Sequence, residues 1–227
     1  LAVSLACSKA AAKFLKIPLF NYIGGISLSL PTPLMNIVNG GCHSNNKLDF
    51  QEFMIVPMGF RSFKESLRAG CEIFNYLKDL LNKHNFSISV GDEGGFAPNF
   101  NSNQECLDFI INSIERAGYK PGKNIFVALD VASSEFFDGK KYKVLSESLE
   151  MSAQELIKYY ENLIRNYPII SIEDGLDEKD WEGWNIMTRE IGNKCQLVGD
   201  DLFVTSVDRL KTGISRESGN SILIKPN

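Results

Sequence analysis

The sequence predicts an α/β protein built as a parallel barrel, and three observations lead to this prediction. Four apolar runs rich in β-branched residues each stop at a charged residue, at positions 130, 173, 200 and 225. The intervals from one charge to the next are 43, 27 and 25 residues, which is typical of strand–helix–strand units. Between the runs, apolar residues recur at helical spacing.

The first half of the chain is predicted to depart from this alternation. Residues 1–16 form an alanine-rich amphipathic helix, and a connector that contains Gly and Pro follows it. Two strands come next, with a glycine loop between them, and then two amphipathic helices. The expected ranges are 33–41 and 48–59 for the strands, and 62–85 and 103–119 for the helices.

The second half alternates regularly, which favours a parallel sheet. The carboxyl ends of parallel barrel strands gather at one mouth, where active sites lie. The charges that end the strands would therefore meet there. The expected strands are 125–130, 168–173, 196–200 and 221–225, and the expected helices are 152–166, 179–191 and 205–217.

Three of the strand ends carry carboxylates, from Asp130, Glu173 and Asp200. Carboxylates that lie close together repel one another unless a cation holds them, and oxygen ligands favour Mg²⁺ or a similar hard ion. Lys225 ends the fourth run, and its position favours a lysine that faces the metal over an ordinary solvated one. The sequence therefore predicts a metal-dependent enzyme.

Other polar residues leave two interpretations open. Asp174 and Asp201 follow strand-end acids directly, and each is explained equally well as a site residue or as a helix cap or turn former. Gln51 and Glu52 interrupt an apolar strand. Because adjacent strand residues face opposite sides, at least one of these two side chains is expected to point inward.

Two glycine loops, 39–46 and 91–95, are polar and flanked by apolar structure. Paired glycines allow tight backbone paths and close approach to a ligand. The loops would expose His43 and Glu93 at their tips. Each of these residues is equally well explained as a plain turn residue.

Composition excludes several classes of protein. The net charge of −4 gives no basic excess for binding nucleic acid. No apolar run reaches the roughly 18 residues that a membrane span needs. The five cysteines are scattered and odd in number, which favours reduced thiols and a cytoplasmic protein.

Seven motifs, in their order along the chain, resemble the enolase family. They cover the chain from end to end, which makes the resemblance far stronger than any single pattern. The motifs are MNIVNGG, DFQEFMIVP, VGDEGGFAPN, ALDVASSEFF, SIEDGLDEKDW, LVGDDLFVT and ILIKPN.

The resemblance implies a small N-terminal domain followed by a barrel that opens strand–strand–helix–helix. Residues 1–24 would be the end of the first domain and a linker. Residues 25–227 would hold about six of the eight barrel strands. We therefore expect the chain to be part of a longer enolase and to be inactive by itself.

The resemblance also implies an activity, the Mg²⁺-dependent reversible dehydration of 2-phosphoglycerate to phosphoenolpyruvate in glycolysis and gluconeogenesis. Asp130, Glu173 and Asp200 match the metal ligands, and Asp201 would lie just behind them. Lys225 matches the base that removes the C2 proton.

Further roles follow from the same resemblance. Glu93 matches the acid that assists departure of the C3 hydroxyl, and Glu52 lies beside it. His43 would sit on the loop that closes over the substrate, and Gln51 would line the site.

The resemblance implies a homodimer. The alternatives are another enzyme of the enolase superfamily, an inactive paralogue, and a plasminogen-binding role at the cell surface or after secretion. For plasminogen binding the expected segment is 135–144, but a hairpin turn at Asp138 and Gly139 is the simpler interpretation of it. The inactive paralogue is disfavoured because the expected acids and the lysine are present.

Overall fold

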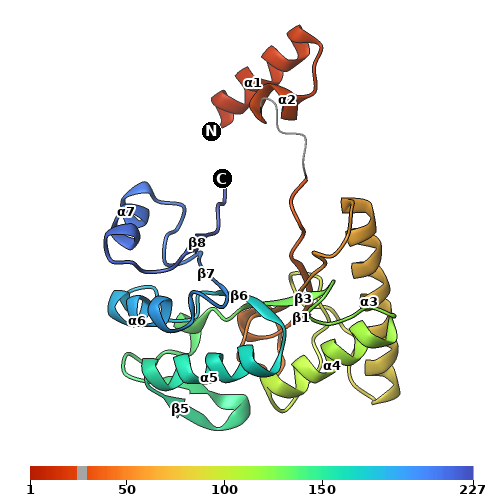
Figure 1. The fold of residues 1–227 in the computed structure, drawn as a ribbon, viewed down its shortest axis with the longest axis vertical. Helices are drawn as coiled ribbons and strands as arrows, with labels where there is room; N and C mark the ends of the chain where they lie inside the picture. The colour runs from red at the N-terminus through yellow and green to blue at the C-terminus, as the bar shows by residue number, and fades with distance from the viewer. Residues whose placement is uncertain (25–29, 227) are drawn as a thin grey trace. The chain divides into compact units, whose positions relative to one another are not determined.

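The computed structural model describes residues 1–24 and 30–226, and it divides into two units (Figure 1). Leu1–Pro31 and Lys225–Asn227 form the first unit, and Thr32–Ile224 forms the second. The first unit contains α1 (Ala2–Leu15) and α2 (Leu19–Gly24). The predicted first helix is confirmed.

The connector prediction missed α2. Its first hydrogen bonds run from the backbone N–H groups of Asn21 and Tyr22 to the carbonyl of Pro18. Proline is well tolerated at the start of a helix because its missing N–H would have no helical partner there. The sequence alone does not distinguish a proline within a loop from a proline that begins a short helix.

The second unit is built on a six-stranded sheet with the order β1-β2-β3-β6-β7-β8. β2 runs antiparallel to both of its neighbours, β1 and β3, whereas β3, β6, β7 and β8 run parallel to one another. Within the described residues β1 and β8 are the edges, so the sheet is an incomplete barrel. The strands are β1 (Met35–Asn39), β2 (Glu52–Val56), β3 (Phe126–Asp130), β6 (Ile169–Glu173), β7 (Gln196–Gly199) and β8 (Ser221–Ile222).

Five helices accompany this sheet, and two of them separate β2 from β3, as predicted. Each of the five begins after a Ser or Asp whose side chain accepts a hydrogen bond from a backbone N–H three residues later. Such caps satisfy N–H groups that lack helical partners. The helices are α3 (Phe63–Lys83), α4 (Asn103–Arg116), α5 (Ala153–Asn166), α6 (Trp181–Ile191) and α7 (Val207–Ser215).

The long interval between β3 and β6 holds a second sheet that the sequence did not predict. A two-stranded hairpin, β4 (Tyr142–Val144) and β5 (Leu149–Met151), precedes α5. Its strands have three residues each, which is too short for an alternating pattern to stand out. Short 3₁₀ turns lie at Gly41–His43, Ser133–Phe136 and Leu145–Glu147.

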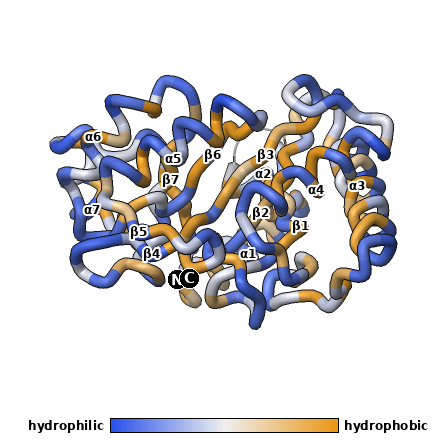
Figure 2. The backbone as a smooth tube through the Cα atoms, turned by 90° about the horizontal axis from the view of Figure 1, so that it is seen from below, coloured by the Kyte–Doolittle hydropathy of each residue, from blue (hydrophilic) through white to orange (hydrophobic). Residues whose placement is uncertain are grey.

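The two faces of the sheet differ in how much apolar surface they bury. Phe53 and Ile55 of β2 belong to the large core shared with the helices, whereas Met54 and Val56 form a small cluster with Ala128. Figure 2 shows hydrophobic residues concentrated along the strands. The side chains that follow the small cluster toward the strand ends are charged, and they form the site described next.

The last predicted strand, 221–225, is shorter than expected. Beyond Ile222 the N–H of Leu223 still donates to the carbonyl of Gly199, where β7 ends. Ile224 is 59% exposed. The pairing of β8 stops here because its neighbour β7 ends at Gly199. Among the helices that the structure describes, none combines the length and apolar character needed to cross a membrane.

Candidate metal centre

Three acidic residues form a row across one end of the sheet, where β2 begins and where β3 and β6 end. Glu52 of β2 lies opposite Asp130 of β3, and Asp130 lies opposite Glu173 of β6. Asp130 and Glu173 are buried, at 6% and 8% exposure. Like charges directly opposite one another destabilise a sheet, so this row needs a compensating positive charge.

Burial and mutual repulsion raise the pKa values of the two buried acids of the row, Asp130 and Glu173. Burial is the main cause that raises the pKa of Asp130 to about 7, and the charge of Glu52 is the second. Burial likewise raises the pKa of Glu173 to about 9, with further repulsion from Asp130. Burial also raises the pKa of the neighbouring Asp174 to about 7. The row therefore resists full ionisation unless a cation is close.

The geometry suits a metal ion. Asp130, Glu173 and Asp174 each offer an oxygen atom, and these atoms lie within 4.8 Å of one another. Asp174, Asp200 and Asp201 form a second such group. The predicted ligands are thus divided between two groups that share Asp174. Donors that are all carboxylate oxygens fit a hard divalent ion such as Mg²⁺.

Gln51 reaches the same row from the residue before β2. Its side-chain amide donates a 2.8 Å hydrogen bond from Nε2 to Oδ2 of Asp130. This bond lowers the pKa of Asp130 and partly offsets the effect of burial. Gln51 therefore favours the ionised form of Asp130, the form that binds a cation.

A second cluster adjoins the row at Glu52. His43 Nδ1 lies 3.4 Å from Glu52 Oε1. His43, Glu52 and Glu93 each offer an atom within 4.8 Å of the others. Because Glu93 is exposed and Glu52 is half-buried, the cluster runs from solvent to the buried carboxylates.

Backbone hydrogen bonds bring the two glycine loops together. The N–H of Asp92 donates to the carbonyl of His43, and the N–H of Gly95 donates to Oδ1 of the buried Asn39. Phe96 exchanges hydrogen bonds with β1, through the carbonyl of Ile37 and the N–H of Asn39. The loop that carries Glu93 is therefore fixed to the edge strand.

Gly95 makes this close approach possible. A Cβ atom at Gly95 would lie 2.8 Å from the backbone nitrogen of Val38 and 2.8 Å from Oδ1 of Asn39. Contacts this short are not tolerated, so a residue with a side chain would push the loop away from β1. The glycine loop predicted from the sequence thus has a steric cause in the fold.

Lys225 is exposed and lies three residues beyond β8. It falls into the first unit of the structure, with residues 1–31, and not into the sheet unit. The predicted meeting of this lysine with the carboxylates therefore stays a prediction.

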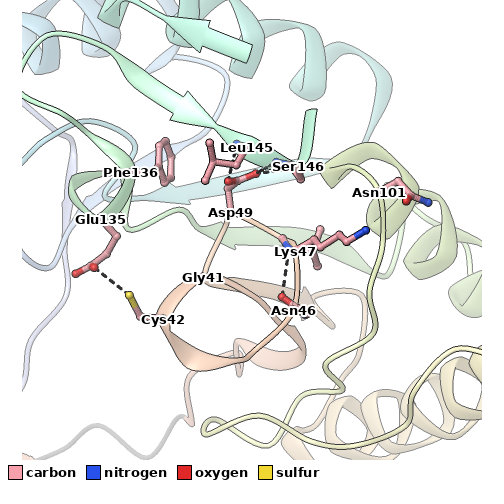
Figure 3. A pocket seen from close by; sticks show the side chains of 11 residues that line it. Gly41, Cys42, Asn46, Lys47, Asp49, Asn101, Glu135, Phe136, Leu145 and Ser146 are labelled. Carbon is pink, nitrogen blue, oxygen red and sulfur yellow. Dashed lines mark hydrogen bonds between the residues drawn. The ribbon is translucent and has the colours of Figure 1, made fainter. Parts of the chain in front are cut away.

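A cavity of about 610 Å³ lies beside the first glycine loop (Figure 3). Cys42 donates a 2.9 Å hydrogen bond from Sγ to Oε2 of Glu135, and this bond is the main cause that raises the thiol pKa. The carboxylate of Asp49 accepts hydrogen bonds from the backbone of Leu145 and Ser146. These contacts tie the loop to segments that follow β3. Nothing in the sequence signalled them, because the partners are more than 90 residues apart.

Asp174 makes a contact that the sequence did not predict, since the residue was equally well explained as part of the site or as a helix cap or turn former. Its carboxylate accepts hydrogen bonds from the backbone N–H groups of Asp200 and Asp201. The acid thus fixes the end of a neighbouring strand, 26 and 27 residues further along the chain. A pair of acids after a strand is the only local signal, and it does not reveal this partner.

A comparison with protein families agrees with this geometry. The family described as the enolase C-terminal TIM barrel domain matches residues 27–227. The match includes the six-stranded sheet, both glycine loops and all four charged strand ends. The chain belongs to the enolase C-terminal TIM barrel domain family.

Proposed function

We propose that the protein is an enolase that catalyses the reversible, Mg²⁺-dependent dehydration of 2-phosphoglycerate to phosphoenolpyruvate. One observation carries the proposal. The row of the half-buried Glu52 and the buried Asp130 and Glu173 shares Glu52 with the cluster of His43, Glu52 and Glu93. Candidate metal ligands and candidate acid–base groups therefore lie next to one another, as metal-assisted removal of a proton and a hydroxyl group requires.

Asp130, Glu173 and Asp200 would hold the metal ion. When bound, Mg²⁺ would stabilise the negative charge that builds up on the substrate's carboxylate as the C2 proton leaves. Asp130 and Glu173 support this assignment, because both are buried, lie opposite each other and have raised pKa values. A divalent ion would restore their ionised forms.

The acid–base roles would fall to Lys225 and Glu93. Lys225 would accept the C2 proton on its Nζ atom and must be neutral to do so, which nearby cations favour. Hydroxide is a poor leaving group, so Glu93 would donate a proton to the C3 hydroxyl as it departs. Glu52 would orient Glu93 and His43, and Gln51 would keep Asp130 ionised.

Glu93 is exposed in this structure, so the reaction would require closure over the substrate. The loop that contains His43 and the loop that contains Glu93 are joined by the hydrogen bond from Asp92 to His43. They would therefore close together. Closure excludes water and strengthens the electrostatic interactions inside the site.

The test uses the complete natural protein that contains these 227 residues. Phosphoenolpyruvate absorbance is followed from 2-phosphoglycerate with Mg²⁺ and with EDTA, for the wild type and for Lys225→Ala. We expect turnover that depends on Mg²⁺ and falls by about 10²–10⁴-fold in the variant. Lys211→Ala, which changes an exposed lysine on α7, is the control and should retain wild-type turnover.

Other outcomes would redirect the assignment. A protein that binds Mg²⁺ but does not convert 2-phosphoglycerate would be another enzyme of the superfamily, acting on a different carboxylate. Turnover that persists in EDTA would contradict the role given to the carboxylate row.

The surface-binding role expected at 135–144 gains no specific support. The N–H of Asp138 donates to the carbonyl of Lys141, and Gly139 has a φ of +93°, as in a tight turn. Lys141 pairs with Glu155, and Lys143 pairs with Asp138. These lysines hold the turn together, so plasminogen binding stays a prediction. A binding assay with Lys140 and Lys141 replaced would test it.

A further inference from the structure

Asp174 connects the three strand ends that carry the proposed metal ligands. It directly follows β6, which ends at Glu173. Its N–H donates to the carbonyl of Val198 in β7, and its carbonyl accepts from the N–H of Ser133, just after β3. Both hydrogen bonds are 3.0 Å long. The backbone of one residue thus bridges β3, β6 and β7.

The side chain of Asp174 adds a second set of bonds. Its carboxylate accepts hydrogen bonds from the N–H groups of three consecutive residues after β7: Asp201 at 2.8 Å, Asp200 at 3.2 Å and Leu202 at 3.5 Å. Asp174 is only 5% exposed. Hydrogen bonds from backbone N–H groups to a buried carboxylate are charge-assisted and strong, so they fix the path of this loop.

The loop that Asp174 holds is strained. Val204 and Thr205 have φ values of +41° and +53°, which is a rare conformation for β-branched residues. Arg209 holds the same loop from the other side, because its guanidinium donates to the carbonyls of Leu202 and Glu178. Strained backbone persists only where surrounding contacts determine it.

Asp174 belongs to both oxygen groups that could hold a cation. A carboxylate has about four acceptor positions, and three of those in Asp174 already face backbone N–H groups. We infer that Asp174 is a positioning residue, not a metal ligand: it holds the backbone of Asp200 in place beside Glu173 before the metal binds. This inference rests on the proposed metal site.

The experiment replaces Asp174 by Asn in the complete natural protein. Asn accepts a left-handed conformation about as well as Asp, and Asp174 has a φ of +44°. The backbone can therefore be kept while one acceptor oxygen becomes an N–H donor that faces the N–H of Asp201 or Asp200. Asp177→Asn is the matched control, because it removes the same charge from the same loop and the Asp177 carboxylate accepts a local hydrogen bond, from the N–H of Lys179.

Mg²⁺ affinity is measured by titration calorimetry, and the free energy of unfolding is measured in EDTA. We expect Asp174→Asn to bind Mg²⁺ about 10- to 100-fold more weakly than the wild type. Asp177→Asn should stay close to the wild type. Wild-type affinity in Asp174→Asn would overturn the inference, even if the variant were less stable. Complete loss of binding, equal to that of Glu173→Gln, would make Asp174 a ligand and would also overturn it.

Hydrogen exchange gives a readout that does not depend on the variant folding. In the wild type in EDTA, the amides of Asp200, Asp201 and Leu202 should already be protected, because Asp174 holds them without metal. Fast exchange in EDTA would contradict the inference. If the wild type itself failed to bind Mg²⁺, the proposed function would fail, and protected amides would still show that Asp174 holds the loop.

Discussion

Asp130 and Glu173 lie directly opposite each other on the parallel strands β3 and β6, and both side chains are buried. Two ionised carboxylates in this arrangement repel each other with little water between them. The sheet tolerates the pair because one partner can stay protonated or because a cation can lie between them.

Replacing Glu173 by Gln should stabilise the protein when no metal is present. Above about pH 9, where Glu173 is ionised, the variant removes one buried charge, and at lower pH its amide imitates the protonated acid. We expect the free energy of unfolding in EDTA above pH 9 to rise by on the order of 1–3 kcal/mol, and we expect the stabilisation by Mg²⁺ to disappear. Denaturant unfolding with EDTA and with Mg²⁺ measures both effects. A variant that is less stable in EDTA would show that Glu173 is held mainly by hydrogen bonds.

The stability of the metal-free protein should fall as the pH rises from 5 to 9. The folded pKa values of Asp130 and Glu173, about 7 and about 9, lie above their unfolded values of about 3.9 and 4.3. The folded state therefore binds more protons between these limits. The stabilisation that comes from these bound protons is complete below about pH 4. It is lost as the pH rises through the folded pKa values, about 7 for Asp130 and about 9 for Glu173.

Thermal unfolding in EDTA across this pH range tests the prediction. The gain in melting temperature on adding Mg²⁺ should grow with pH, because the metal takes the place of the protons. Glu173→Gln should flatten the dependence in EDTA. A wild-type protein whose stability in EDTA is constant from pH 5 to 9 would contradict the raised pKa values.

Replacing Gly95 by Ala should displace the loop that carries Glu93. The added Cβ would meet the backbone of Val38 at 2.8 Å, so the loop must move. We expect a loss of stability of about 1–3 kcal/mol together with a lower kcat. Gly24→Ala is the control: a Cβ there would have open space within 4 Å, and its effect should stay within about 0.5 kcal/mol.

Arg209→Lys should destabilise the loop after β7. The guanidinium of Arg209 binds two carbonyls and lies 5.4 Å from the ring centre of Trp181. A lysine ammonium cannot reproduce this planar arrangement. We expect a loss of about 1–3 kcal/mol in denaturant unfolding. Arg189→Lys, on the exposed face of α6, should have almost no effect. Equal stability of both variants would show that Arg209 does not hold the loop.

The order of the main elements could be predicted from the sequence because its signals are local. The strands of the sheet unit are buried runs, and its five helices have clear caps and amphipathic spacing. The row of Glu52, Asp130 and Glu173 was foreseen in part, since charges that end parallel strands must meet at one mouth. The cross-strand register that places them opposite one another emerges only in the fold.

Other features depend on contacts between distant residues and could not be predicted. The short strands β4 and β5 carry too few residues for a pattern. The bonds from Asp174 to Asp200 and from Cys42 to Glu135 join segments that only folding brings together. Lys225 was expected at a strand end, but β8 ends at Ile222 because β7 offers no further partner.

Through Phe96, the loop that carries Glu93 also covers the edge strand β1. The backbone of Phe96 occupies the outer side of β1, and its ring stacks on Phe74 with a centroid distance of 4.2 Å. A change that detaches this segment would leave peptide groups of an edge strand free to pair with another chain. Damage to the loop should therefore appear as self-association, with light scattering that grows with protein concentration, as well as lost turnover. The hydrogen bonds between Phe96 and β1 fix the base of this loop, so a movement that keeps the edge strand covered must take place at its tip.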